Sequence, residues 1–113
     1  MSMVGLFNRR VDQKRKTSAA STVSAAGTVT WSVVRHGIAC RIWTVGSSDL
    51  VKFGKATGEM SHVLMCGPHV GIKSWDLLSE GSVIYDIAGP PQPVYASRRL
   101  HHYEVALLER IES

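Results

Sequence analysis

The chain has 113 residues, 44% of them hydrophobic, with two cysteines and a formal net charge of +4. This length allows one domain with a modest core, which excludes a multistep enzyme with a deep cleft. Cys40 and Cys66 lack the C-x-x-C spacing of a zinc or redox motif, and no apolar run is long enough for a signal peptide or a membrane span. We therefore expect a soluble protein without a membrane partner, made in a reducing cytoplasm with both thiols free.

Positive charge is concentrated at the N-terminus, while the charges of residues 28–113 cancel. Residues 1–27 contain one acid, Asp12, and five cations, which are Arg9, Arg10, Lys14, Arg15 and Lys16. Since the cations are followed by a Ser- and Ala-rich stretch with few large apolar groups, the segment predicts a flexible arm ahead of a domain at residues 28–113.

This basic arm has two interpretations. As a nucleic-acid contact, its cations would bind phosphates without sequence preference. As an assembly arm, they would pair with acidic surfaces of a neighbouring subunit and become ordered on binding. We favour the assembly arm.

The next segment predicts a β-hairpin. Residues 28–34 and 38–45 alternate apolar and polar side chains, which indicates two half-buried strands, and residues 35–37 predict a tight turn between them. We expect Trp31 to lie in the core and Trp43 at a subunit interface, because tryptophans on alternating strands serve most often in these two ways.

Residues 46–59 interrupt the alternation and predict a long loop, with one helical turn after the possible cap Ser48. A connection of this length in a small domain usually carries a function or an interface rather than stability.

Three further strands are predicted at residues 61–66, 82–88 and 100–111, with a shorter extended piece at 70–73. The Pro-rich stretch Gly89–Pro93 cannot join a strand ladder and predicts a stiff projecting tip. In the last strand, one face is apolar and includes Tyr103, Val105, Leu107 and Ile111. The predicted fold class is all-β: a small antiparallel β-barrel with a long loop and a flexible N-terminal arm.

No residue set predicts catalysis or the binding of a metal or cofactor. His101 and His102 are adjacent on a predicted strand, so their side chains are expected on opposite faces, where they cannot share a metal ion. The stretch from Gly54 to Thr57 is similar to the end of a phosphate-binding loop, but that motif needs a glycine where Asp49 or Leu50 stands and a Ser or Thr directly after Lys55. We therefore expect a protein that is not an enzyme and uses no cofactor.

Five short motifs follow one another in a recognisable order. They are Gly37-Ile-Ala-Cys-Arg41, Ser61-His-Val-Leu64, Ile72-Lys-Ser-Trp-Asp76, Gly81-Ser-Val-Ile-Tyr-Asp-Ile87 and His101-His-Tyr-Glu-Val105. Their order and spacing over residues 28–112 resemble those of the head-closure, or head-tail connector (stopper), proteins of tailed bacteriophages.

The resemblance implies a structural protein of the virion neck, assembled in the host cytoplasm into a six-fold ring of identical subunits. Its partners would be the portal or its adaptor, a tail terminator or tail tube protein, and packaged double-stranded DNA in the channel. Residues 46–59 would line the channel, with Ser48, Lys52 and Lys55 facing the DNA. The basic arm and residues 89–99 would dock neighbours, with Pro91, Pro93 and Tyr95 joining Trp43 at interfaces.

Two other function classes remain open. A small β-barrel that binds nucleic acid would use aromatic side chains on its sheet and charge from the arm. An enzyme comes last, because no activated nucleophile or acid-base pair can be placed.

Overall fold

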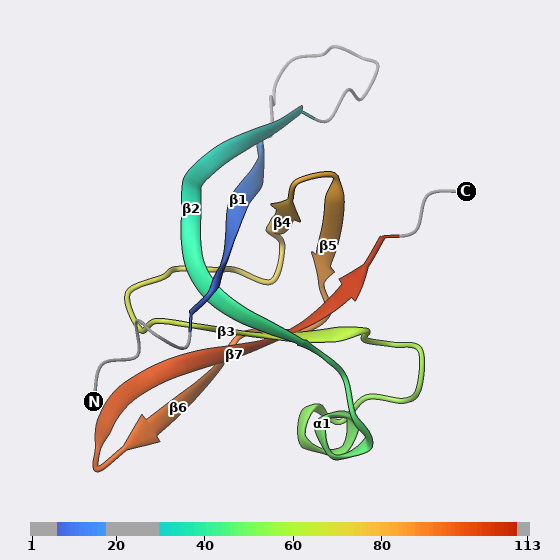
Figure 1. Ribbon diagram of the computed structural model, residues 1–113, viewed down its shortest axis with the longest axis vertical. Coiled ribbons are helices and arrows are strands. Elements are labelled where there is room, and N and C mark those ends of the chain that lie inside the picture. Colours follow the sequence, from blue (N-terminus) through green and yellow to red (C-terminus); the bar gives the residue numbers. More distant parts are fainter. Residues whose placement is uncertain (1–6, 18–29, 111–113) are drawn as a thin grey trace.

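The structure, a computed structural model, describes residues 7–17 and 30–110. It contains seven strands and one short helix in these residues (Figure 1). In chain order they are β1 (Arg9–Thr17), β2 (Thr30–Thr44), α1 (Ser47–Phe53), β3 (His62–Cys66), β4 (Leu77–Glu80), β5 (Val83–Ile87), β6 (Gln92–Ala96) and β7 (Arg99–Glu109).

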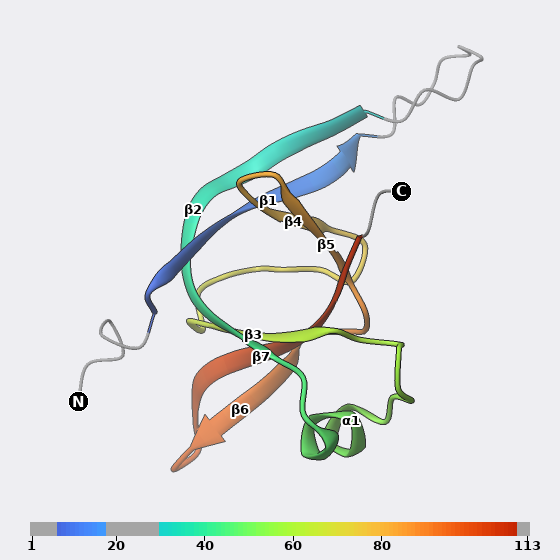
Figure 2. The same ribbon diagram turned by 45° about the vertical axis from the view of Figure 1, so that its right-hand side comes forward.

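Six of the strands close into an antiparallel barrel, which confirms the predicted fold class. The ring runs β3-β2-β1-β4-β5-β7, and β7 pairs back with β3 through residues 103–107. The seventh strand, β6, pairs with β7 outside this ring. The curved sheet and its closure are visible when the molecule is turned by 45° (Figure 2).

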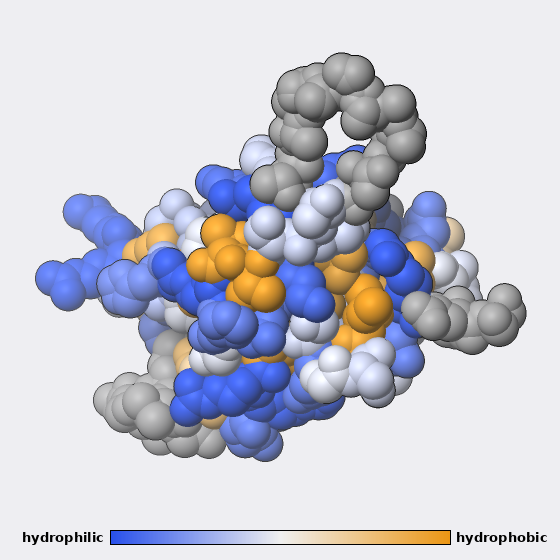
Figure 3. All heavy atoms as spheres, turned by 90° about the horizontal axis from the view of Figure 1, so that it is seen from above, coloured by the Kyte–Doolittle hydropathy of each residue, from blue (hydrophilic) through white to orange (hydrophobic). Residues whose placement is uncertain are grey.

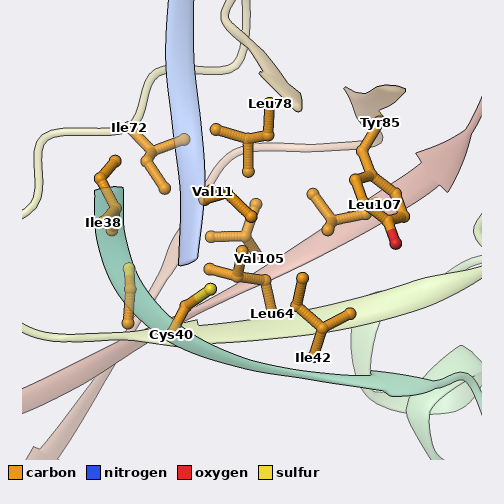
Figure 4. Close-up of a cluster of buried hydrophobic side chains, with 11 residues drawn as sticks. Val11, Ile38, Cys40, Ile42, Leu64, Ile72, Leu78, Tyr85, Val105 and Leu107 are labelled. Atoms are coloured by element: carbon orange, nitrogen blue, oxygen red, sulfur yellow. The ribbon is translucent and has the colours of Figure 1, made fainter. Parts of the chain in front are cut away.

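The barrel interior is filled by the alternate side chains that the strands point inward (Figure 4). Eleven buried side chains form this cluster: Val11, Ile38, Cys40, Ile42, Leu64, Cys66, Ile72, Leu78, Tyr85, Val105 and Leu107. The prediction that both cysteines are free and pack in the core is confirmed. Burial raises the pKa of Cys40 to about 11 and that of Cys66 to about 12, so both thiols stay protonated.

The predicted flexible arm is wrong for residues 9–17, because they form β1 between β2 and β4. The segment is poor in apolar residues, yet its one large apolar side chain, Val11, points into the core and is 1% exposed. Gln13 is also buried, and its amide is satisfied by hydrogen bonds. The folded unit therefore begins earlier than residue 28. The rest of the predicted arm, residues 1–6 and 18–27, lies outside the described residues.

The predicted hairpin over residues 28–45 is also wrong, since β2 is one long, strongly bent strand (Figure 1). The expected turn at residues 35–37 is a bulge instead: Gly37 has φ +61°, and the pairing with β1 shifts between Val11 and Lys14. The Asp12 carboxylate accepts a hydrogen bond from the Gly37 amide at 3.0 Å and holds this bulge in place. Trp31 lies beyond the bulge and is 36% exposed, so its predicted core position is wrong.

The later strands agree better with the sequence. The strands predicted at 61–66, 82–88 and 100–111 correspond to β3, β5 and β7, and Tyr103, Val105 and Leu107 point inward as expected. Strands β4 and β6 were not predicted, and residues 70–73 form no strand. Pro93 belongs to β6, so the stretch Gly89–Pro93 is no separate projecting tip. Pro93 fits there because β6 is an edge strand.

Candidate interaction surfaces

Three parts of the chain stand away from the barrel. Residues 14–17 of β1 and 30–33 of β2 form a ribbon, hereafter the β1–β2 ribbon, which starts at the last pairing of β1 with β4, between Lys14 and Leu77, and continues past it. The β6–β7 hairpin leaves the barrel in another direction, and the segment with α1 in a third (Figures 1 and 2).

Helix α1 lies against the outer wall of the barrel over a second, smaller hydrophobic cluster. The buried members of this cluster are Met60, Val63 and Ala106, and Leu50 and Phe53 of the helix pack against them. No residue of α1 is itself buried. The helix is therefore attached by a few partly exposed contacts, which makes it a low-stability element of the fold.

Trp43 takes part in this attachment. It is half-buried, packs against the smaller cluster, and its indole Nε1 donates a hydrogen bond to Asp49 Oδ2 at 3.3 Å. The Arg41 guanidinium lies 5.7 Å from the centre of its ring. A shallow depression of about 360 Å³ is lined by Arg41, Trp43 and Met65. Trp43 thus has partners within its own chain, and its predicted role at a subunit interface stays a prediction.

A polar chain links α1 to β7. Lys52 Nζ donates to Glu104 Oε1, Glu104 Oε2 lies 3.0 Å from His102 Nε2, and His102 Nδ1 lies 2.8 Å from His101 Nδ1. One of the two facing Nδ1 atoms must carry the proton. Burial works to raise the pKa of Glu104, but the hydrogen bonds from Lys52 and His102 outweigh it and lower that pKa.

The expected separation of His101 and His102 is wrong. Val94 pairs with His102 while Tyr95 pairs with Leu100, so His101 is an extra residue without an opposite partner. Such a bulge interrupts the strict alternation of side chains. It brings the two imidazole rings to a centroid distance of 5.1 Å.

The predicted loop residues are not alike in their surroundings. Ser48 is exposed on α1, and Lys52 is tied to Glu104. Lys55 is half-buried beside the β5–β6 connection, where its Cε lies 3.7 Å from the position of a Cβ at Gly89. Lys52 and Lys55 thus both contact other parts of the fold, at β7 and at the β5–β6 connection. Their predicted role toward DNA stays a prediction.

Two of the five cations of the predicted arm are used inside the fold. Arg9 forms a two-bonded ion pair with Glu80, with Nε 2.8 Å from Oε2, and this hydrogen bonding lowers the pKa of Glu80. Arg15 binds Asp76 through Nε at 2.7 Å and Nη2 at 3.0 Å. These two arginines stabilise opposite ends of β4 and are not free assembly contacts.

The other three cations lie on the outer face of β1. Arg10 and Lys16 are exposed and Lys14 is half-buried. The strand register puts Lys14 opposite Val33 and Lys16 opposite Trp31. Directly opposed residues of an antiparallel pair share a face. The result is a face on which the lysines of β1 lie opposite exposed apolar side chains of β2, hereafter the ribbon face (Lys14, Lys16, Trp31 and Val33).

Sequence reasoning missed the ribbon face because its members come from two segments more than ten positions apart. Only the pairing of β1 with β2 brings them together. The alternation of Lys14 and Lys16, with Asp12 and Arg10 before them, was the available signal for a strand with one charged side.

The β6–β7 hairpin carries the predicted interface residues Pro91, Pro93 and Tyr95. Tyr95 is 63% exposed and Pro93 is exposed, whereas Pro91, directly before β6, is half-buried. Pro90 and Pro91 line a depression of about 290 Å³ together with Trp75 and Tyr103. The structure therefore places apolar and aromatic groups at this hairpin, and its role as an interface stays a prediction.

The described residues contain no group of three or more His, Cys, Asp or Glu side chains arranged to hold a metal ion. Every buried side-chain nitrogen or oxygen in this part of the chain has a hydrogen-bond partner. Among the described helices, none combines the length and apolar character needed to cross a membrane.

No protein-family model matches the chain, and no curated protein matches its sequence. Among solved structures, it is similar to the solution structure of protein SF1141 from Shigella flexneri 2a. The TM-score is 0.69 at 17% sequence identity, over 99% of this chain and 100% of the other. At this identity the similarity shows a shared fold alone.

Proposed function

We propose that this protein is a structural component of a tailed-phage virion that forms a ring at the head-tail junction. The ring closes the portal channel after DNA packaging and offers a docking surface to the tail. The observation that carries the proposal is a closed barrel with a small core, from which three separate elements reach outward (Figures 1 and 2). The order of the five motifs supports the same assignment.

The motifs fall at positions that shape the barrel. Asp76, the end of the third motif, is buried and organises the loop before β4. Gly81, the start of the fourth motif, has φ +61° in the two-residue turn between β4 and β5. Glu104 in the fifth motif binds Lys52. Because the motifs include residues that organise the turns and contacts of the barrel, their resemblance supports a common scaffold.

Ring formation needs two different surfaces on each subunit, because a head-to-tail contact repeated around an axis closes a ring. Residues 30–38 of β2 pair with β1 on one edge, and no strand of the described chain pairs on the other. Strand β6 is likewise paired on one edge. These two edges and the β6–β7 hairpin are the surfaces we assign to neighbouring subunits and to the portal, adaptor or tail protein.

A second candidate function is a small β-barrel that binds nucleic acid. The observation that favours it is the ribbon face, where Lys14 and Lys16 lie beside Trp31 and Val33. Mixed basic and aromatic surfaces of this kind are typical of nucleic-acid contacts.

The proposal is tested by electron microscopy of particles from a virus in which this gene is inactivated, scoring attached tails and retained DNA. We expect tailless heads that have packaged and then lost their DNA, and full recovery when the intact gene is supplied on a plasmid. Normal tailed virions would overturn the connector assignment and favour the nucleic-acid-binding barrel.

A further inference from the structure

We infer that the ribbon face, continued by Arg10 along β1, binds the phosphate backbone of duplex DNA. The choice of duplex DNA as the partner rests on the proposed function, while the site itself follows from the arrangement of charges on β1 and β2.

The first argument is the charge that remains after internal ion pairs are formed. Arg9 and Arg15 are neutralised by Glu80 and Asp76. None of the described ion pairs includes Arg10, Lys14 or Lys16, although the charge of Lys14 contributes to lowering the pKa of Asp12. A surface on which several cations outnumber the carboxylates attracts phosphates and repels cations.

The second argument is that a single acid, Asp12, shares this side of β1 with the three cations. Strand β2 contains no acidic residue. The one acid of β1, Asp12, accepts a hydrogen bond from the Gly37 amide and lies 3.5 Å from His36 Nδ1. Its carboxylate is therefore turned toward the bulge of β2 and is already occupied.

The third argument is spacing. Arg10, Lys14 and Lys16 project from the same side of one regular strand, since the extra residues of the bulges lie on β2. Residues two apart on a strand are separated by about 7 Å. Lys14 and Lys16 are therefore about 7 Å apart, and Arg10 lies about 14 Å from Lys14, with Asp12 at the position between them. Cations in such a row can contact the backbone of a DNA strand without any base-specific group, so we expect binding without sequence preference.

The fourth argument is shape. The β1–β2 ribbon continues past the last pairing of β1 with β4, so part of the ribbon face lies beyond the barrel wall, where the backbone of DNA can approach it. Seen from above, on the side where the ribbon ends, apolar residues (orange) are exposed among hydrophilic ones (blue) (Figure 3). Trp31 and Val33 place apolar atoms beside the lysines, where they can pack against the sugars.

The test uses the full chain and a short fluorescent DNA duplex, with binding followed by anisotropy between about 50 and 200 mM salt. Three phosphate contacts predict a slope of log K against log salt of about −2.7, since each contact contributes about −0.9. The double variant K14Q/K16Q leaves one contact, so its slope falls to about −0.9 and its affinity drops about tenfold or more at low salt. Circular dichroism and urea unfolding establish that the variant is folded.

The matched control is R98Q/R99Q, which removes two exposed cations from the other projecting hairpin. We expect it to bind DNA with the slope of the unchanged protein. Equal losses in the two double variants would overturn the proposal and indicate a response to net charge alone.

Two other outcomes would also overturn it. Tighter binding of a single strand than of the duplex, lost in W31A, would assign the ribbon face to unpaired nucleic acid. Absence of DNA binding, together with an oligomer that K14Q/K16Q dissociates, would assign the face to a neighbouring subunit. Neither outcome decides whether tails attach, so failure here is distinct from failure of the connector proposal.

Discussion

Two ion pairs, Arg15–Asp76 and Arg9–Glu80, hold the two ends of β4 against β1. Asp76 precedes the strand and is 4% exposed. It accepts hydrogen bonds from Arg15, from Gln13 Nε2 at 2.7 Å and from the Lys73 amide at 2.8 Å. At the other end of β4, the Glu80 carboxylate accepts a hydrogen bond from Arg9 Nε. Both acids are bound to β1, so polar contacts as well as Val11 fix this strand in the barrel.

For Asp76 we expect the substitution D76N to lower the free energy of unfolding by about 2 kcal/mol, because it removes a charged acceptor used by three donors. The measurement is urea unfolding at neutral pH. The matched control is D86N, since Asp86 forms an exposed ion pair with Arg110. Exposed pairs contribute about 0–1 kcal/mol. Equal effects of D76N and D86N would show that the buried network adds no stability.

Acid stability follows from the same carboxylate. Burial works to raise the pKa of Asp76, but the hydrogen bonds from Arg15, Lys73 and Gln13 lower it overall. The ionised form is therefore favoured in the fold, and its stabilisation is present above the pKa of the unfolded chain, about 4. This stabilisation is lost as the pH falls through the lower pKa of the folded state. In urea titrations between about pH 7 and 3, D76N should show a shallower loss of stability than the unchanged protein.

The turn of the β6–β7 hairpin is strained at two residues. Ser97 and Arg98 have φ values of 51° and 72°, as a two-residue turn of this type requires, although neither is glycine. We expect R98G to raise the free energy of unfolding by about 0.5–1 kcal/mol, because glycine adopts this conformation without a steric cost. The control R99G changes a residue of β7 and should lower stability by a similar amount. A loss of stability in R98G would contradict the assignment of strain.

At the scale of elements, α1 depends on its contact with β7 more than on burial. None of its side chains is buried, and Lys52 binds Glu104. We expect E104Q to speed amide exchange of Leu50, Gly54 and Lys55, whose amides bond within or just after the helix, by about five- to tenfold. Exchange in β3 and β5 should not change.

The control for this experiment is K55Q, which removes a neighbouring positive charge that does not contact Glu104. Faster exchange in both variants would mean that overall charge, and not the Lys52–Glu104 contact, holds the helix.

The elements predicted from sequence are those with a local signature. β3, β5 and β7 show alternation or apolar runs bounded by Gly and Pro, and β7 has a clear inward set at Tyr103, Val105 and Leu107. Strand β1 was not predicted, because its buried polar residue, Gln13, and its paired arginines have the sequence pattern of a solvent-exposed run of charges. Their acidic partners lie more than 60 positions later, and no local pattern reveals them.

The same reason explains the errors on β2 and at the histidines. In the sequence, Gly37 has the character of a turn residue. In the structure, pairing with β1 continues past it, so Gly37 forms part of a bulge. The bulge at His101 depends on the register of β6 against β7. In the candidate surfaces, single residues such as Tyr95 were predicted, whereas the ribbon face required the β1–β2 register.

At the scale of the whole molecule, β1 is a wall of the barrel and not an appendage. It lies between β2 and β4, and Val11 is part of the main core. We expect a chain that lacks residues 1–17 to lose cooperative urea unfolding, because the ring is opened and two strand edges are exposed. The variant K14Q/K16Q, with β1 intact, is the control and should unfold cooperatively. A cooperative transition in the shortened chain would restore the interpretation of this segment as a separate arm.

The closure of the barrel by β7 determines when the chain can fold during synthesis. β7 is the last strand of the described residues, and it pairs with β3, β5 and β6. While the ribosome still holds β7, the earlier strands form at most an open sheet with unpaired edges. The barrel is therefore completed only after β7 has left the ribosome. A chain that ends before β7 therefore exposes strand edges that favour aggregation.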